Sequence, residues 1–225
     1  MFNPLGSFDP NAPLALDALQ AAREFKATLP AVPRGLLNRL YLHWAVEAFG
    51  CLDGAYNFEI DLEGGHWVMK MTHNPQDNAP GMNNHAEAWH TWHRNTGAIG
   101  IAIAGMDGAS THNFGADGVQ MHELEYLCAL AALCAVQYGI DTAGIVPAPG
   151  VTHVDNVGGN VNTTGEHVIL THGECAVIDS YPTERWDLGS LVSLTDGVSL
   201  TPEMRTLCGN ALRERIHRYA LVLKG

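Results

Sequence analysis

Strand-like and helix-like segments alternate along this chain, and that order constrains the fold more than any other feature. The apolar segment 98–103 is typical of a buried strand, and the apolar segment 117–138 predicts a long helix that Gly139 is suited to end. Thr201 and Pro202 are typical of the first positions of a helix, here one that runs to about residue 223. The other predicted elements are a helix over 14–28 and strands over 39–43, 56–60, 67–71 and 167–170. This alternation predicts the α/β class, with a central mixed β-sheet flanked by helices.

The length and composition fit a single domain with a large core. The chain has 225 residues, of which 46% are hydrophobic and 16% charged. That balance is too apolar for a disordered chain. We expect residues 1–36 to form an N-terminal helical extension packed on a domain that covers residues 37–225.

Charge and cysteine content exclude several classes of protein. The net charge of −12 argues against a basic nucleic-acid-binding surface and against an anchor for anionic membranes. The longest strongly apolar run, 124–136, is too short to span a bilayer, and the N-terminus lacks the basic and apolar regions of a signal peptide. We therefore expect synthesis in the cytoplasm, with any export by another route. Five cysteines without a CxxC pair make a disulfide scaffold improbable.

Histidine is unusually frequent for an acidic chain, with 12 residues. Neutral imidazole is the commonest metal ligand, so this excess favours a metal site. His43 and His172 each fall at the end of a predicted strand, where a rigid backbone suits a ligand. Each could equally be an ordinary loop histidine, and the segment 184–189 could be a surface turn. Composition and spacing do not join these three pieces into one site.

Six elements in a fixed order resemble a known enzyme family. They are Arg39–Ala45, the hairpin of Gly54–Gly64, His85–Ala86 followed by Asn95–Ile101, the long helix from Gln120 to Tyr138–Ile140, Leu170–His172, and Arg185–Asp187. Together they are similar to the zinc-dependent N-acetylmuramoyl-L-alanine amidases of the type-2 amidase and peptidoglycan recognition superfamily. The resemblance covers about residues 37–195.

The sequence departs from the family pattern at several places. Asn57 stands where His is usual, Ala98 replaces Ser, and Arg185 replaces Lys. Leu188–Gly189 replaces Pro–Gly, and the stretches 140–168 and 172–187 are longer than usual. Among the zinc ligands that the family pattern implies, the third, which follows the long stretch 172–187, is the one most affected by these departures.

The resemblance implies a Zn²⁺ ion held by His43, His172 and Asp187. Asp187 fits the family pattern of a ligand placed after a loop and two residues past a basic side chain; Cys175 and His153 are the alternatives. Two imidazoles and one carboxylate leave a position open for water, whose pKa zinc lowers toward about 7. The resemblance further implies that Tyr56 hydrogen-bonds the attacking water or the oxyanion, and that Arg185 stabilises the oxyanion by charge alone.

A loop rich in aromatic and polar residues is the predicted substrate-binding surface. Trp89 and Trp92 are candidates because aromatic rings stack on sugar faces and peptide stems, and His85 and Asn95 are candidates because the resemblance includes them. Simple packing within the loop is the alternative. Glu174, two residues past His172, could orient a ligand histidine, act as a general base, or be a solvated acid.

The implied activity is hydrolysis of the amide bond between N-acetylmuramic acid and L-alanine, with peptidoglycan or muropeptides as partners. It would suit a bacteriolytic phage endolysin released through a holin, a cytoplasmic recycling enzyme or a secretion-system effector. The alternatives are a peptidoglycan-binding module without catalysis on the same fold, and a zinc hydrolase of another amide.

Overall fold

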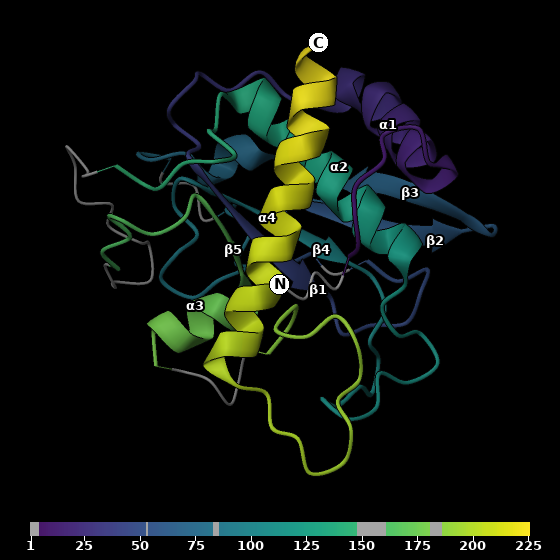
Figure 1. Cartoon of the computed structure of the whole chain (residues 1–225). Helices are drawn as coiled ribbons and strands as arrows, with labels where there is room; N and C mark the ends of the chain where they lie inside the picture. Colours follow the sequence, from purple (N-terminus) through teal and green to yellow (C-terminus); the bar gives the residue numbers. More distant parts are fainter. Residues whose placement is uncertain (1–4, 53, 83–85, 148–160, 181–185) are drawn as a thin grey trace.

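Five strands form one mixed sheet in the computed structural model, which describes residues 5–52, 54–82, 86–147, 161–180 and 186–225 (Figure 1). The strands are β1 (Arg39–Trp44), β2 (Phe58–Glu63), β3 (His66–Met71), β4 (Ala98–Ile103) and β5 (Ile169–Thr171). Their order across the sheet is β3-β2-β4-β1-β5. β1 runs parallel to β4 and β5, β2 runs parallel to β4, and β2 and β3 form an antiparallel hairpin. The predicted α/β class with a mixed sheet is confirmed.

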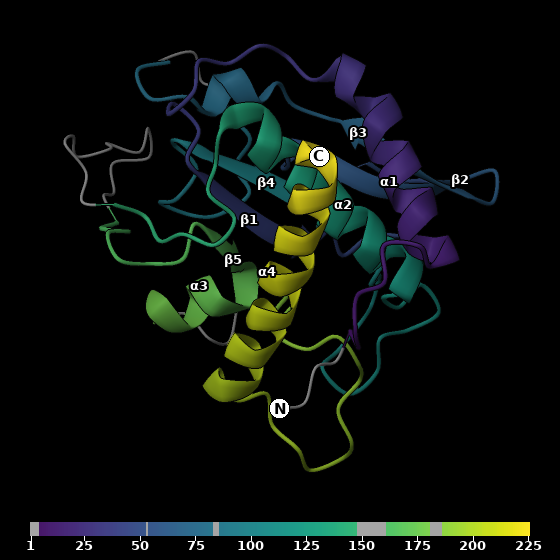
Figure 2. The same ribbon diagram turned by 45° about the horizontal axis from the view of Figure 1, so that its top comes forward.

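Three helices cover one face of this sheet (Figures 1 and 2). They are α1 (Pro13–Phe25), α2 (Met121–Tyr138) and α4 (Pro202–Lys224), and α2 packs against both of the others. Gly139 ends α2 with a φ of +78°, as predicted, and the Thr201 side chain accepts a hydrogen bond from the Met204 N–H at the start of α4. None of the helices in the described ranges is long and apolar enough to cross a membrane.

The start of α2 differs from the sequence prediction. The helix begins at Met121, four residues later than expected. Gln120 and Glu123 form a capping box there, so the polar pair satisfies the free backbone N–H groups and fixes the first turn. A short helix, α3 (His172–Ile178), and two 3-10 turns, η1 (Lys26–Thr28) and η2 (Pro75–Asn78), complete the elements. Neither α3 nor η2 was predicted.

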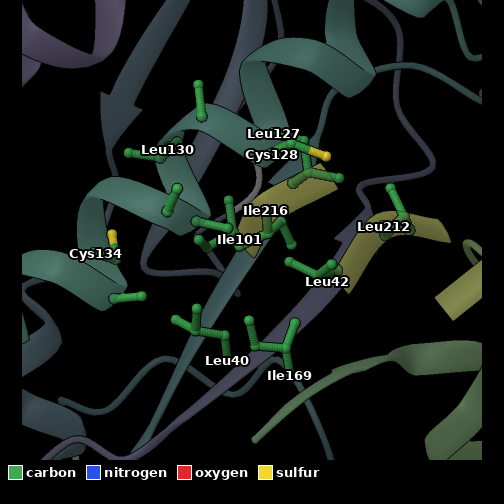
Figure 3. Close-up of a cluster of buried hydrophobic side chains, with 14 of the residues drawn as sticks. Leu40, Leu42, Ile101, Leu127, Cys128, Leu130, Cys134, Ile169, Leu212 and Ile216 are labelled. Atoms are coloured by element: carbon green, nitrogen blue, oxygen red, sulfur yellow. The ribbon is translucent and has the colours of Figure 1, made fainter. Parts of the chain in front are cut away.

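The apolar core lies between the sheet and the three helices. Alternate residues of β1 and β4 point toward α2 and α4, as Leu40, Leu42 and Ile101 do (Figure 3). Leu130 of α2 and Ile216 of α4 meet them from the other side and are fully buried. Burial of each such side chain contributes about 1.5–3 kcal/mol. α1 adds to the same core through its packing on α2, while the boundary at residue 36 stays a prediction.

The opposite face of the sheet is polar and is covered by loops and α3. β4 presents only small residues there, namely Ala98, Gly100 and Ala102, whereas β2 and its approach present the buried polar side chains of Asn57, Glu59 and Asp61. A Cβ atom on Gly100 would lie 2.3 Å from the ring of His90, so the absence of a side chain at this position is what admits the loop of residues 86–97. His43 belongs to this face.

Candidate metal centre

Parallel pairing of β1 with β5 brings two histidines together. Leu42 of β1 lies opposite Thr171, the last residue of β5, so the next residue on each segment is His43 and His172. Their ring centroids are 4.6 Å apart. His172 was predicted to end a strand; it is instead the first residue of α3, because Thr171 acts as the N-cap of that helix. The helix turns the chain away from the sheet and leaves the His172 ring beside His43.

Asp187 completes a group of three potential metal ligands. Its Oδ2 atom lies 3.0 Å from Nδ1 of His43 and 3.0 Å from Nδ1 of His172, and its Oδ1 atom lies 2.9 Å from the latter. Ligand atoms of the three side chains all lie within 4.8 Å of one another, so the group could hold a metal ion. The alternative ligand Cys175 is buried against Tyr41 and lies outside this group. His153 falls outside the described residues.

Backbone contacts hold Asp187 in place. The Gly173 N–H donates to the Asp187 carbonyl at 2.9 Å, and Arg205 donates to the Gly173 carbonyl at 3.1 Å. A Cβ atom on Gly173 would lie 3.0 Å from the Gly189 backbone, so the first turn of α3 packs directly on the loop that carries Asp187. Leu188, buried beside it, has a φ of +54°, which is a strained conformation for a leucine. Strain of this kind persists only where the surroundings fix the backbone.

The electrostatics of the group suit a divalent cation. Burial alone would raise the pKa of Asp187, but the adjacent His172 and His43 hold it well below its usual range. The carboxylate is therefore ionised and faces two imidazole nitrogens. Zinc sites use the same donor types at about 2.0–2.2 Å, which places tetrahedral ligand atoms about 3.3 Å apart. The separations of 2.9–3.0 Å between the Asp187 oxygens and the two Nδ1 atoms are close to that value, so the three residues could hold a metal ion.

Tyr56 lies beside the group. Its ring centroid is 5.0 Å from that of His43, and its hydroxyl donates to the Trp44 carbonyl at a long 3.3 Å. The side chain is half-buried. Its predicted catalytic role stays a prediction. The other predicted catalytic residue, Arg185, lies outside the described residues.

The predicted substrate-binding residues divide into two sets. Trp89 and Trp92 are 60% and 44% exposed, as a stacking surface requires, and Trp92 lies against His93 with ring centroids 3.9 Å apart. Asn95 is only 2% exposed, and its side-chain oxygen accepts the Thr91 N–H at 2.8 Å. This contact makes Asn95 a brace inside the loop, so we correct its predicted role from substrate contact to support. His85 lies outside the described residues.

The interpretation of Glu174 as a solvated acid was wrong. Glu174 is buried, and its carboxylate accepts the Thr171 N–H at 3.0 Å in the capping box of α3. The same carboxylate pairs with both terminal nitrogens of Arg213 at 2.8 and 2.9 Å. These contacts tie α3 to α4, so Glu174 stabilises the element that carries His172.

Sequence reasoning missed two residues that shape the site. The Thr91 hydroxyl lies 3.2 Å from Nε2 of His43. Arg94 is buried and pairs with Glu166 at 2.7 Å and with Asp179 at 2.6 Å, which joins the loop of residues 86–97 to the end of α3 and to the segment before β5. Nothing in a single Thr or Arg within a polar loop distinguishes such a role, because both depend on partners more than 40 residues away.

Asn57 links the sheet to the loop of residues 86–97. Its side-chain amide donates to Asn78 at 2.9 Å, and its side-chain oxygen accepts the Gly100 N–H at 2.8 Å. Asn78 in turn donates to the carbonyls of Ala88 and Asn95. Asn57 thus anchors the loop that covers the site.

Comparisons of the chain with protein-family models, with curated proteins and with solved structures found no match.

Proposed function

We propose that this protein is a zinc-dependent N-acetylmuramoyl-L-alanine amidase that hydrolyses the amide bond between N-acetylmuramic acid and L-alanine in peptidoglycan or its fragments. The observation that carries the proposal is the convergence of His43, His172 and Asp187, three residues that lie far apart in the sequence. The family resemblance selected these same three residues as ligands. The partner and the cellular compartment rest on that resemblance alone.

The metal would be held by the two imidazoles and the Asp187 carboxylate. When bound, zinc supplies an activated water and polarises the scissile carbonyl. Two neutral imidazoles would leave the charge of the ion uncompensated, and the ionised Asp187 would offset one unit of it. His43 is fully buried and His172 is partly exposed, so a substrate would approach from the His172 side.

Side chains around the group have distinct roles in this proposal. The Tyr56 hydroxyl donates a long hydrogen bond of 3.3 Å to the Trp44 carbonyl, and in this proposal it donates to the oxyanion instead. The exposed rings of Trp89 and Trp92 present flat apolar surfaces on which a sugar or a stem peptide can stack. Arg185 remains the candidate cation for the developing charge.

The test is digestion of purified peptidoglycan followed by mass spectrometry of the soluble products. The proposal expects free stem peptides that begin with L-alanine, and it expects their release to stop in a chelator and to resume when Zn²⁺ is restored. Intact muropeptides after digestion with zinc present would reject the amidase. Retention of the protein on the same walls without cleavage would instead support a binding module, for which the exposed tryptophans are the favouring observation.

A further inference from the structure

Two hydrogen bonds meet at the hydroxyl of Thr91. Its oxygen lies 3.2 Å from Nε2 of His43 and 3.0 Å from Nδ1 of His90. A hydroxyl carries one proton to donate and can accept others. Thr91 is 1% exposed, and its hydroxyl makes no third hydrogen bond within the described ranges. Its proton therefore goes to one of the two imidazoles, and the other imidazole donates to its oxygen.

A cation in the metal centre would decide which of the two imidazoles donates to Thr91 and which accepts from it. The Nδ1 atom of His43 faces Asp187, so a cation in the group would take the lone pair of Nδ1. A neutral imidazole that gives one nitrogen to a metal carries its proton on the other. The Nε2 proton of His43 then requires an acceptor, and the Thr91 oxygen is in place to receive it.

His90 can accept the remaining proton. A neutral imidazole offers one acceptor nitrogen. With Nδ1 of His90 as that acceptor, the hydrogen bonds run from His43 to Thr91 to His90.

The fold fixes both members of this pair. The His90 ring occupies the space above Gly100 of β4, where a Cβ atom would lie 2.3 Å away, and it stands 5.6 Å from the His43 ring. The backbone of Thr91 is held by the Asn95 side chain at 2.8 Å. The hydroxyl is thus presented to His43 by a loop that is itself anchored on the sheet.

We propose that Thr91 is a positioning residue for the metal centre, whose hydroxyl, supported by His90, holds the His43 ring with the Nδ1 lone pair directed toward His172 and Asp187. The inference rests on the proposed metal site and names a residue that sets its affinity. The two histidines then differ: Nε2 of His172 is buried and makes no hydrogen bond within the described ranges, so His43 is the braced ligand.

The test is the affinity for Zn²⁺, measured by competition with a chromophoric chelator on the full chain. Thr91→Val keeps the shape and removes the hydroxyl, and we expect it to bind zinc about 10- to 100-fold more weakly, the range for loss of a partner that orients a ligand. Thr91→Ser restores the hydroxyl and should bind within about 3-fold of wild type. Thr142→Val is the matched control, because Thr142 makes a similar hydrogen bond, 2.7 Å from Nδ1 of His217, away from the site.

The protonation of His43 provides a second measurement. In the zinc-bound protein, nitrogen-detected NMR of the histidine rings should show the His43 proton on Nε2, and Co²⁺ substitution should give an altered visible spectrum in Thr91→Val. Equal zinc affinity of Thr91→Val and wild type would overturn the proposal, as would an equal loss in Thr142→Val. Should Thr91→Val fail to fold, Thr91→Ser and the NMR assignment of wild type decide the question.

These outcomes separate the inference from the proposed function. A wild-type protein that binds zinc but leaves peptidoglycan intact would reject the amidase and leave the Thr91 measurements valid. A wild-type protein that cleaves peptidoglycan while Thr91→Val binds zinc normally would reject the role of Thr91 alone. A wild-type protein that binds no zinc would reject both.

Discussion

The two faces of the sheet are held by different interactions. On the helix-covered face, the core consists mainly of apolar side chains such as Leu42, Ile101 and Leu130 (Figure 3), with the buried pair of Arg215 and Glu125 between α4 and α2. On the loop-covered face, burial is as complete, but side chains such as His43, Asn57 and Arg94 are held by hydrogen bonds and ion pairs. Apolar packing tolerates substitution of similar volume, whereas a buried polar network loses much when one member is removed. Substitutions on the helix-covered face should therefore change mainly the free energy of unfolding. Substitutions on the loop-covered face should change mainly metal binding and the proposed catalysis.

The largest expected effect is the loss of zinc affinity when one candidate ligand on the loop-covered face is removed. Asp187→Ala should weaken zinc binding by about 1,000-fold, since one of three ligands carries roughly a third of the 10–16 kcal/mol typical of zinc sites. Isothermal competition with a chelator measures this loss. Cys175→Ser, at the rejected third-ligand position, should leave zinc affinity within a few-fold of wild type. Full zinc occupancy in Asp187→Ala would remove the residue from the site.

Truncation of a core side chain on the helix-covered face should lower stability and leave zinc affinity unchanged. Leu130→Ala should lower the free energy of unfolding by about 2–5 kcal/mol, because the side chain is fully buried between α2 and the sheet. Urea denaturation of the metal-free protein measures this change. Zinc affinity below the unfolding transition should stay within about 3-fold. A parallel fall in affinity would show that the two faces are coupled through the sheet.

Loss of a single hydroxyl should separate catalysis from binding. Tyr56→Phe should lower turnover by about 10- to 1,000-fold, in the range of a lost oxyanion hydrogen bond, with zinc content and stability retained. Product release from purified peptidoglycan measures turnover. Tyr126→Phe is the control from the helix-covered face, where the hydroxyl donates to Asp17 at 2.8 Å. Unchanged turnover in Tyr56→Phe would make Tyr56 a packing residue.

One buried carboxylate makes the helix-covered face sensitive to pH. Burial raises the pKa of Glu123 to about 8, with a further contribution from Asp117 and partial compensation by the Gln120 N–H. The folded protein holds this proton more tightly than the unfolded chain, so stability is greatest below pH 4.5 for this group and falls as pH rises toward 8, by up to about 1.4 kcal/mol per pH unit. Urea midpoints at pH 5.5, 7 and 8.5 measure the slope. Glu123→Gln should flatten it, and identical slopes in the two proteins would contradict the assignment.

The smallest expected effect concerns salt. The net charge is −12, and the exposed surface predicted to meet the wall carries Trp89 and Trp92, so short-range contacts rather than charge attraction should govern binding. Binding to purified walls should change by less than about 3-fold between 50 and 300 mM salt, a range over which the Debye length falls from about 14 to 6 Å. A steep loss of binding would indicate a basic contact surface instead.

The helix-covered face was predictable from the sequence, because its elements depend on local periodicity. Segment 98–103 gave β4 without error, and Gly139 and Thr201 marked helix ends correctly. Helix α3 was missed because it has only seven residues, and its start depends on the Thr171–Glu174 capping box.

The site was predictable only in part. His43, His172 and Asp187 were selected by resemblance; the pairing of β1 with β5 explains why the two histidines meet, and the contact of the Gly173 N–H with the Asp187 carbonyl brings in the third residue. The support from Thr91 and Arg94 could not be predicted, since each depends on a loop whose path over Gly100 is fixed only by the folded sheet. Asn95 was selected for the surface and lies inside for the same reason.

The distance along the chain between the ligands sets the time at which the centre can form during synthesis. His43 and Asp187 are separated by 144 residues, and at 5–20 residues per second a ribosome needs about 7–30 s to add them. β5 ends at Thr171, so all five strands of the sheet have been synthesised before Asp187 is added. Acquisition of an ion by all three residues is therefore a late event, and it would mark a nascent chain whose sheet has closed.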